Sequence, residues 1–214
     1  MSTIFALITP PGRSGVAVIR VSGPMAFDAC LSLTGVVPRA RWATMAVVKD
    51  ENEKPVDEAL LLAFPSPASF TGEDIVEFQL HGSVAVIRAV LRLLSSVEGL
   101  QPAGPGEFTR RALANGKMSL TEVEGLGDLL QSETEAQRKQ AFLLLSGALK
   151  QKAEQWRRNL LKVRGLLEAA IDFSEEDIGD DLRSQARPLV EVLQREIEAE
   201  IELASRANRV REGL

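Results

Sequence analysis

The chain has 214 residues, 45% of them hydrophobic, which is enough for one or two domains with an apolar core. A formal net charge of −5 and an aromatic content of 5%, without tyrosine, argue against a large RNA-binding surface on this chain. The single cysteine excludes an internal disulfide. The sequence has neither a signal peptide nor an apolar run near the roughly 20 residues of a membrane span, so we expect a soluble, cytoplasmic protein.

The first 117 residues are predicted to form an α+β domain with a mixed or antiparallel sheet. This part holds nine of the ten prolines and ten of the sixteen glycines, and short apolar runs lie between its turns. Strands are predicted near Ile4–Ile8, Val16–Ser22, Ala43–Val48, Ala59–Phe64 and Ile75–Leu80. Helices are predicted at Pro24–Leu33, Ser83–Ser96 and Glu107–Ala114.

Two of these strands carry polar side chains that a core strand does not need. Successive side chains on a strand point to opposite faces. The last predicted strand therefore has an apolar face, Val76, Phe78 and Leu80, and a polar face, Glu77, Gln79 and His81. Arg20 interrupts the apolar second strand, and a buried guanidinium needs an anionic partner. Two interpretations are open, a structural ion pair with Glu77 or a site for an anionic ligand.

The residues after 117 are predicted to form an all-α partial bundle, and they hold 19 acidic and 14 basic residues against 11 of each before. Ser119 is a candidate N-cap with Glu122 as its capping-box partner. Apolar residues at steps of three or four from Leu145 to Ile171 predict one helix of about 35 to 40 residues, roughly 55 Å long. Pro188 is predicted in the first turn of a final helix. One face of that helix carries Leu189, Leu193, Ile197, Ile201 and Ala204.

Short motifs along the chain resemble those of the TrmE/MnmE family of bacterial tRNA-modification GTPases. They occur in order and with family-like spacing from about Thr3 to the last residue. Each motif is weakly specific alone, and the ordered set is strongly specific. The motif residues are Ile8–Val16, Ile19–Gly23, Phe70–Asp74, Pro105–Thr109 with Arg111 and Ala112, Asn115–Lys117 with Leu120, Glu168–Phe173 and Arg211–Gly213.

The resemblance implies a folate-binding and dimerisation domain at residues 1–117 and the first part of a helical domain at residues 118–214. In this family a potassium-dependent GTPase domain is inserted into the helical domain. The resemblance implies an enzyme that uses GTP, Mg²⁺ and K⁺ and acts as a heterotetramer with the FAD-containing partner MnmG. It modifies C5 of the wobble uridine of certain tRNAs with an aminomethyl or carboxymethylaminomethyl group. A 5-formyltetrahydrofolate or related folate supplies the one-carbon unit.

The sequence departs from the family pattern in lacking the G-x-x-x-x-G-K-[ST] loop that cradles phosphates. We therefore expect an N-terminal part of the full enzyme that neither binds nor hydrolyses GTP and has no catalytic residue or metal ligand of its own. Smaller departures are Leu80 and Ser83 beside His81 and Gly82, and Ser174 after the Asp172-Phe173 pair.

Three residues match the folate contacts of the family: Arg20, Glu77 and Lys117. Glu77 is the expected reader of the pteridine, because a carboxylate can accept paired hydrogen bonds from adjacent N–H groups. Arg20 and Lys117 would pair with the glutamate tail or polarise the one-carbon group. For His81 a structural hydrogen bond and a place in the pocket stay open, and Arg13 is either a substrate contact or a loop anchor.

Two other groups have simpler interpretations. Cys30 lies in an amphipathic pattern and is expected to be a buried structural thiol. An acidic cluster resembles a metal loop only loosely and is expected to be a solvated connector between helices. The cluster comprises Glu175, Glu176, Asp177, Asp180 and Asp181.

Two other functions are open, a self-standing folate-dependent one-carbon transferase and a ligand-free structural dimerisation module. The long helices after residue 117 argue against the transferase. The apolar strands Ile4–Ile8 and Ala59–Phe64 predict a homodimer held by the first part of the chain. The competing prediction is association through a helical stripe formed by Leu149, Trp156, Leu160 and Leu167.

Overall fold

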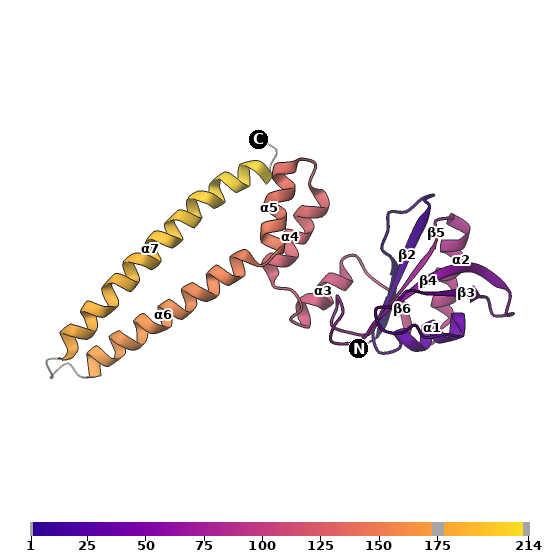
Figure 1. The fold of residues 1–214 in the computed structure, drawn as a ribbon, viewed down its shortest axis with the longest axis horizontal. Helices are drawn as coiled ribbons and strands as arrows, with labels where there is room; N and C mark the ends of the chain where they lie inside the picture. Colours follow the sequence, from indigo (N-terminus) through magenta and orange to yellow (C-terminus); the bar gives the residue numbers. More distant parts are fainter. Residues whose placement is uncertain (1, 173–177, 212–214) are drawn as a thin grey trace. The chain divides into compact units, whose positions relative to one another are not determined.

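The computed structural model describes residues 2–172 and 178–211, and the chain divides into two compact units, residues 1–118 and 119–214. The first unit contains a sheet, and the described residues of the second unit form helices (Figure 1). The boundary predicted after residue 117 differs from this division by one residue. The functions expected of the two parts stay predictions.

The first unit is built on a six-stranded sheet with the order β3-β4-β5-β2-β1-β6. Neighbouring strands pair antiparallel, except that β1 and β6 are parallel. This mixed sheet confirms the predicted fold class, whereas β6 was not predicted because three residues are too few to show a period of two. The strands are β1 (Thr3–Leu7), β2 (Val16–Ser22), β3 (Thr44–Lys49), β4 (Pro55–Phe64), β5 (Ile75–His81) and β6 (Leu100–Pro102).

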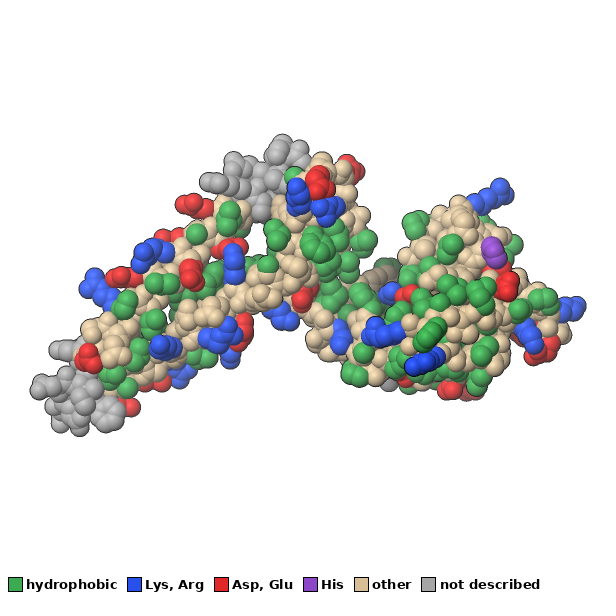
Figure 2. Space-filling model, viewed as in Figure 1, with side chains coloured by type: hydrophobic (Ala, Val, Ile, Leu, Met, Phe, Trp, Pro, Cys, Tyr) green, Lys and Arg blue, Asp and Glu red, His purple; other side chains and the backbone are tan. Residues whose placement is uncertain are grey.

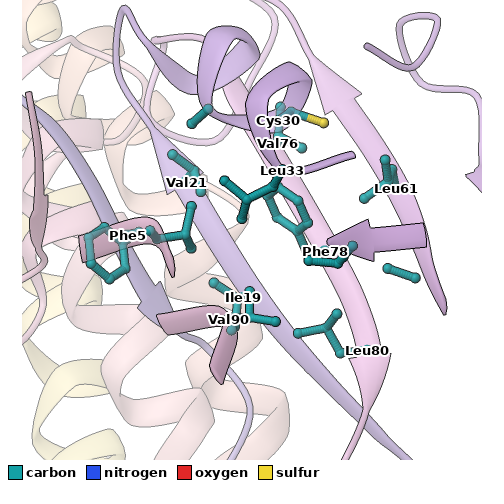
Figure 3. Close-up of a cluster of buried hydrophobic side chains, with 14 of the residues drawn as sticks. Phe5, Ile19, Val21, Cys30, Leu33, Leu61, Val76, Phe78, Leu80 and Val90 are labelled. Carbon is teal, nitrogen blue, oxygen red and sulfur yellow. The ribbon is translucent and has the colours of Figure 1, made fainter. Parts of the chain in front are cut away.

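One face of the sheet forms the core with helices α1 (Ala26–Thr34) and α2 (Val84–Ser96). Figure 3 shows Leu33 and Cys30 of α1 and Val90 of α2 in one cluster with Phe78 of β5. The side chains of Cys30, Val90 and Phe78 are fully buried. Burial raises the pKa of the Cys30 thiol, which matches the expected structural role.

The opposite face carries the polar side chains of β2 and β5. The loop 65–74 and helix α3 (Glu107–Ala114) lie over one end of it, because Ser22 hydrogen-bonds the loop residue Glu73 and Arg111 of α3 forms an ion pair with the same carboxylate. Away from that end Met45 stays 56% exposed. This face is therefore partly polar, partly apolar and only partly covered.

The second unit consists of α4 (Leu120–Gln131), α5 (Glu135–Leu145), α6 (Ala148–Asp172) and α7 (Ile178–Arg211). Helix α4 packs against α5 and helix α6 against α7 (Figure 1), which confirms the predicted all-α region. The predicted capping box is present, with the Ser119 backbone N–H donating to Glu122 Oε2 at 2.6 Å. Among the described residues no helix has the length and apolar content of a membrane span.

Two helix predictions are wrong. The apolar stripe from Leu145 to Ile171 lies on two helices, because Gly147 between α5 and α6 has a φ of 77° and this left-handed conformation ends a helix. Periodicity does not reveal the break, since both helices keep apolar steps of three or four. Pro188 lies inside α7, where its missing N–H removes one backbone hydrogen bond, and not in its first turn.

Candidate functional site

The centre of the candidate site is an ion pair between two neighbouring strands. The antiparallel register of β2 and β5 places Arg20 opposite Glu77. Nε and Nη2 of Arg20 donate to Glu77 Oε1 at 2.9 and 2.7 Å, and the two side chains are 18% and 16% exposed. Among the described residues no group donates to Glu77 Oε2, so one carboxylate oxygen stays available to a ligand.

Two aromatic rings lie against the Arg20 guanidinium. Its Cζ atom is 5.0 Å from the ring centroid of Phe70, in the loop 65–74, and 5.5 Å from that of Phe108, in α3. Both distances are within the range of cation–π attraction. A strand, a loop and a helix therefore hold one cation beside apolar surface, which suits a ligand that combines a flat ring with a charged or polar edge.

A buried polar network fixes the loop 65–74 to the end of β2. Ser22 Oγ donates to Glu73 Oε2 at 2.7 Å and lies 2.7 Å from Thr71 Oγ1. Asn115 Nδ2, just after α3, donates to the Thr71 carbonyl at 2.7 Å. These bonds explain why polar Ser22 and Thr71 can be fully buried.

Arg111 fixes α3 to the same loop. Its Nη1 lies 3.1 Å from both carboxylate oxygens of Glu73, and its Nη2 lies 3.0 Å from Glu107 Oε1. A hydrogen bond from the Gly104 backbone N–H, with the Arg111 guanidinium as a further cause, lowers the pKa of Glu107. The network positions Phe108 beside Arg20. Sequence reasoning missed Phe70, Phe108 and Arg111, for which membership of the family-like motifs was the available signal.

Lys117 lies against the same loop but does not touch the ion pair. Its aliphatic stem passes close to Gly72, where a Cβ atom would lie 3.1 Å from Lys117 Cγ and Cδ. Gly72 also has a φ of 79°, a left-handed conformation that favours glycine there. Lys117 is exposed, and its ammonium group has no ion-pair partner among the described residues. The structure thus brings Arg20 and Glu77 into contact and places Lys117 against the loop that carries Phe70.

His81 and Arg13 lie at the other end of β5, around a cleft of about 730 Å³. His81 Nδ1 is 2.7 Å from Asp57 Oδ1, and the His81 backbone N–H donates to Asp57 Oδ2 at 2.8 Å. The histidine is therefore hydrogen-bonded, as the structural interpretation expects, and its place in the ligand pocket stays a prediction. Arg13 also lines the cleft and makes no hydrogen bond or ion pair among the described residues, which does not support a loop anchor.

The acidic cluster falls mostly outside the residues that the structure describes. Of its members the side chain of Asp181 is described, and it is exposed. Within the described part of the chain no group of three or more His, Cys, Asp and Glu side chains could hold a metal ion. The candidate site thus comprises Arg20, Glu77 and the rings of Phe70 and Phe108, with Lys117 nearby.

Comparison with known proteins gives matches over both units. The family model described as "GTP-binding protein TrmE N-terminus" matches residues 3–117, and the one described as "MnmE helical domain" matches residues 120–214.

Curated relatives match the whole chain. Proteins named "tRNA modification GTPase MnmE" are 50% identical in Ruegeria pomeroyi and 49% identical in Dinoroseobacter shibae, each over 213 residues, and 48% identical in Beijerinckia indica over 216 residues. These alignments cover 100% of this chain and 50%, 50% and 48% of the relatives. The chain therefore spans about half the length of the curated relatives it matches.

Proposed function

Because the chain belongs to the TrmE/MnmE family of tRNA modification GTPases, we propose that its first unit binds a formylated tetrahydrofolate and dimerises. The observation that carries this proposal is the Arg20–Glu77 pair beside two aromatic rings. A pteridine has a flat face and an edge of adjacent N–H donors. The aromatic rings suit the first and the Glu77 carboxylate suits the second.

Each of the three expected contact residues has a role in this proposal. Glu77 accepts hydrogen bonds from the pteridine edge, using Oε2 first, because Oε1 is held by Arg20. Arg20 holds the carboxylate in a fixed orientation through its two hydrogen bonds to Oε1. Lys117 brings an ammonium group on a flexible stem, which can approach the formyl oxygen or a tail carboxylate. When bound, the folate supplies a one-carbon unit.

We extend the proposal to the whole protein from the family. The complete enzyme would act with MnmG, an FAD-containing partner, on the wobble uridine of certain tRNAs in the cytoplasm. This sequence contains no G-x-x-x-x-G-K-[ST] loop, so GTP, Mg²⁺ and K⁺ would be bound by the half of the relatives' length that this chain does not span.

Dimerisation is proposed through the uncovered face of the sheet. Ile4 and Phe5 of β1 are buried within the unit, so β1 does not offer the apolar surface that its sequence suggested. Met45 and Val47 of β3 are 56% and 39% exposed. The register places Met45 opposite Leu60 of β4, which adds to the same apolar surface. A second copy of the chain across a twofold axis would cover it.

A ligand-free structural module is the second candidate, and one observation favours it. Arg20 and Glu77 already satisfy each other, as a purely structural pair would. Calorimetric titration of the chain with 5-formyltetrahydrofolate separates the two, since the proposed function requires saturable binding that Glu77→Ala weakens. Absence of binding would leave the structural module. The self-standing transferase is disfavoured by the four helices after residue 118.

A further inference from the structure

A cationic cleft lies at the end of the sheet opposite the loop 65–74. The loop precedes the first residue of β5, and the cleft opens beside the last, His81. Arg13 and Ser14 from the β1–β2 loop line one side, and Ser83 and Arg88 at the start of α2 line the other. Arg13 and Arg88 are both exposed. The cleft therefore brings together cations from two segments that are far apart in the sequence.

The guanidinium groups of Arg13 and Arg88 are unpaired in the described structure. Neither has a hydrogen-bond or ion-pair partner among residues 2–172 and 178–211. The carboxylate of Asp57, which contacts the cleft residue His81, is occupied by the His81 backbone N–H and Nδ1. Ser83 makes no side-chain capping bond, so the first N–H groups of α2 add further donors. An anion with several acceptor oxygens would satisfy these groups.

The cleft opens at the end of β5 toward which the polar face of the proposed pteridine site extends. Glu77, Gln79 and His81 share one face of β5, and a rise of about 3.3 Å per residue puts His81 about 13 Å from Glu77. Val16 pairs with His81 across the strands and is 54% exposed. Ile8, which is 39% exposed, donates its backbone N–H to the carbonyl of Val18, two residues further along β2. An apolar strip thus connects the Arg20–Glu77 pair to the cationic cleft.

A folate has the same order of groups along its length: a pteridine with a hydrogen-bonding edge, an aromatic p-aminobenzoyl spacer, and a glutamate tail with carboxylates. We propose that the cleft binds this tail through Arg13 and Arg88 and makes the site prefer folates with several glutamates. The inference rests on the proposed folate function. Arginine forks match carboxylate geometry, and a longer tail brings more carboxylates within reach of the cleft.

An RNA phosphate is the competing anion, and the chain as a whole disfavours it. The net charge is −5, and RNA binding draws on an extended basic surface. Two arginines in one cleft are enough for a short polycarboxylate. A folate tail in the cleft would also explain why the cleft opens at the end of the strand that carries Glu77. Binding of an RNA phosphate gives no reason for this position.

The test compares 5-formyltetrahydrofolate carrying one glutamate with the same folate carrying five, by calorimetric titration of the full chain. Exposed ion pairs are individually weak, so two of them should make the pentaglutamate bind roughly fivefold more tightly. R13Q/R88Q should bring the affinity ratio close to one. The matched control is Arg92→Gln, one turn further along α2 and outside the cleft, which should keep the ratio.

The outcomes separate the cleft from the folate site itself. Glu77→Ala should weaken both folates equally and leave their ratio unchanged, which ties the preference to the tail alone. Equal affinity of both folates for the unaltered chain, or a ratio that survives in R13Q/R88Q, overturns the tail assignment and leaves the folate site standing. Failure of both folates to bind overturns the proposed function together with this inference. Loss of RNA stem-loop binding in R13Q/R88Q, with the folate ratio unchanged, reassigns the cleft to phosphate.

Discussion

Removing the Glu77 carboxylate is the most direct test of the site. In Glu77→Ala the Arg20 guanidinium, whose side chain is 18% exposed, loses its acceptor. Breaking a fully buried pair costs about 3–5 kcal/mol and losing an exposed one at most about 1 kcal/mol, so we expect about 2 kcal/mol of lost stability here. Loss of the pteridine contact should weaken the binding of 5-formyltetrahydrofolate by about 2–4 kcal/mol, which raises the dissociation constant roughly 30-fold or more.

A paired apolar substitution separates stability from binding. R20M/E77L removes both charges and keeps similar volumes, so the stability lost in Glu77→Ala should largely return. Folate binding should not return, because no carboxylate is left to meet the pteridine edge. Thermal unfolding measures the stability and calorimetric titration measures the folate affinity. The control is Glu58→Ala, which lies on the same face of the sheet. Unchanged folate affinity in Glu77→Ala would refute the pteridine role, and recovery of binding in R20M/E77L would make the ion pair purely structural.

Four further outcomes are expected. In light scattering M45K/V47K should shift the full chain from dimer to monomer while L160K/L167K does not, and the reverse result would assign dimerisation to the helical stripe. A fluorescent GTP analogue should show no saturable binding to this chain, and a tight titration would contradict the missing phosphate loop. Gly125→Ala should cost about 1–3 kcal/mol, because its Cβ would lie 2.5 Å from the Leu145 nitrogen, whereas Gly127→Ala has open space and should be neutral or stabilising. Hydrogen bonds from Ser119 and the charge of Lys150 lower the pKa of Glu122 in the folded protein. The stability that Glu122 contributes is therefore present above the unfolded pKa of glutamate and is lost as pH falls through the lowered folded pKa. Glu122→Gln should reduce the drop in unfolding temperature that the unaltered chain shows on acidification.

Local patterns in the sequence predicted the elements, and their failures have local causes. The alternation from Ile75 onward predicts both faces of β5 correctly, because a strand that is buried on one side has a strict period of two. The apolar pattern from Leu145 to Ile171 predicted one helix where there are two. Gly147 ends the first helix in a left-handed conformation, while the apolar steps continue across it. A period of three or four detects helix faces but not the single left-handed residue between two helices.

The partners of the site residues depend on pairing between distant strands, which periodicity does not supply. The sequence shows that Arg20 needs an anionic partner, which could be Glu77 or a ligand. The pairing of Arg20 with Glu77 becomes visible in the register of β2 and β5, which places the two residues opposite each other. Phe70 and Phe108 reach Arg20 from a loop and a helix that are fixed by Arg111 and Glu73. Apart from membership of the family-like motifs, neither aromatic residue has a pattern that marks it before the loop and helix are placed.

The ion pair and the ligand site are compatible because Arg20 uses only one oxygen of Glu77. A ligand that donates to Oε2 adds a hydrogen bond without breaking the pair, so binding would not leave a partly buried guanidinium unpaired. The pair also holds the carboxylate in place before the ligand arrives, which lowers the ordering cost of binding. A structural ion pair and a pteridine reader are therefore two uses of the same two side chains, and the apolar double substitution distinguishes them because it restores only the first.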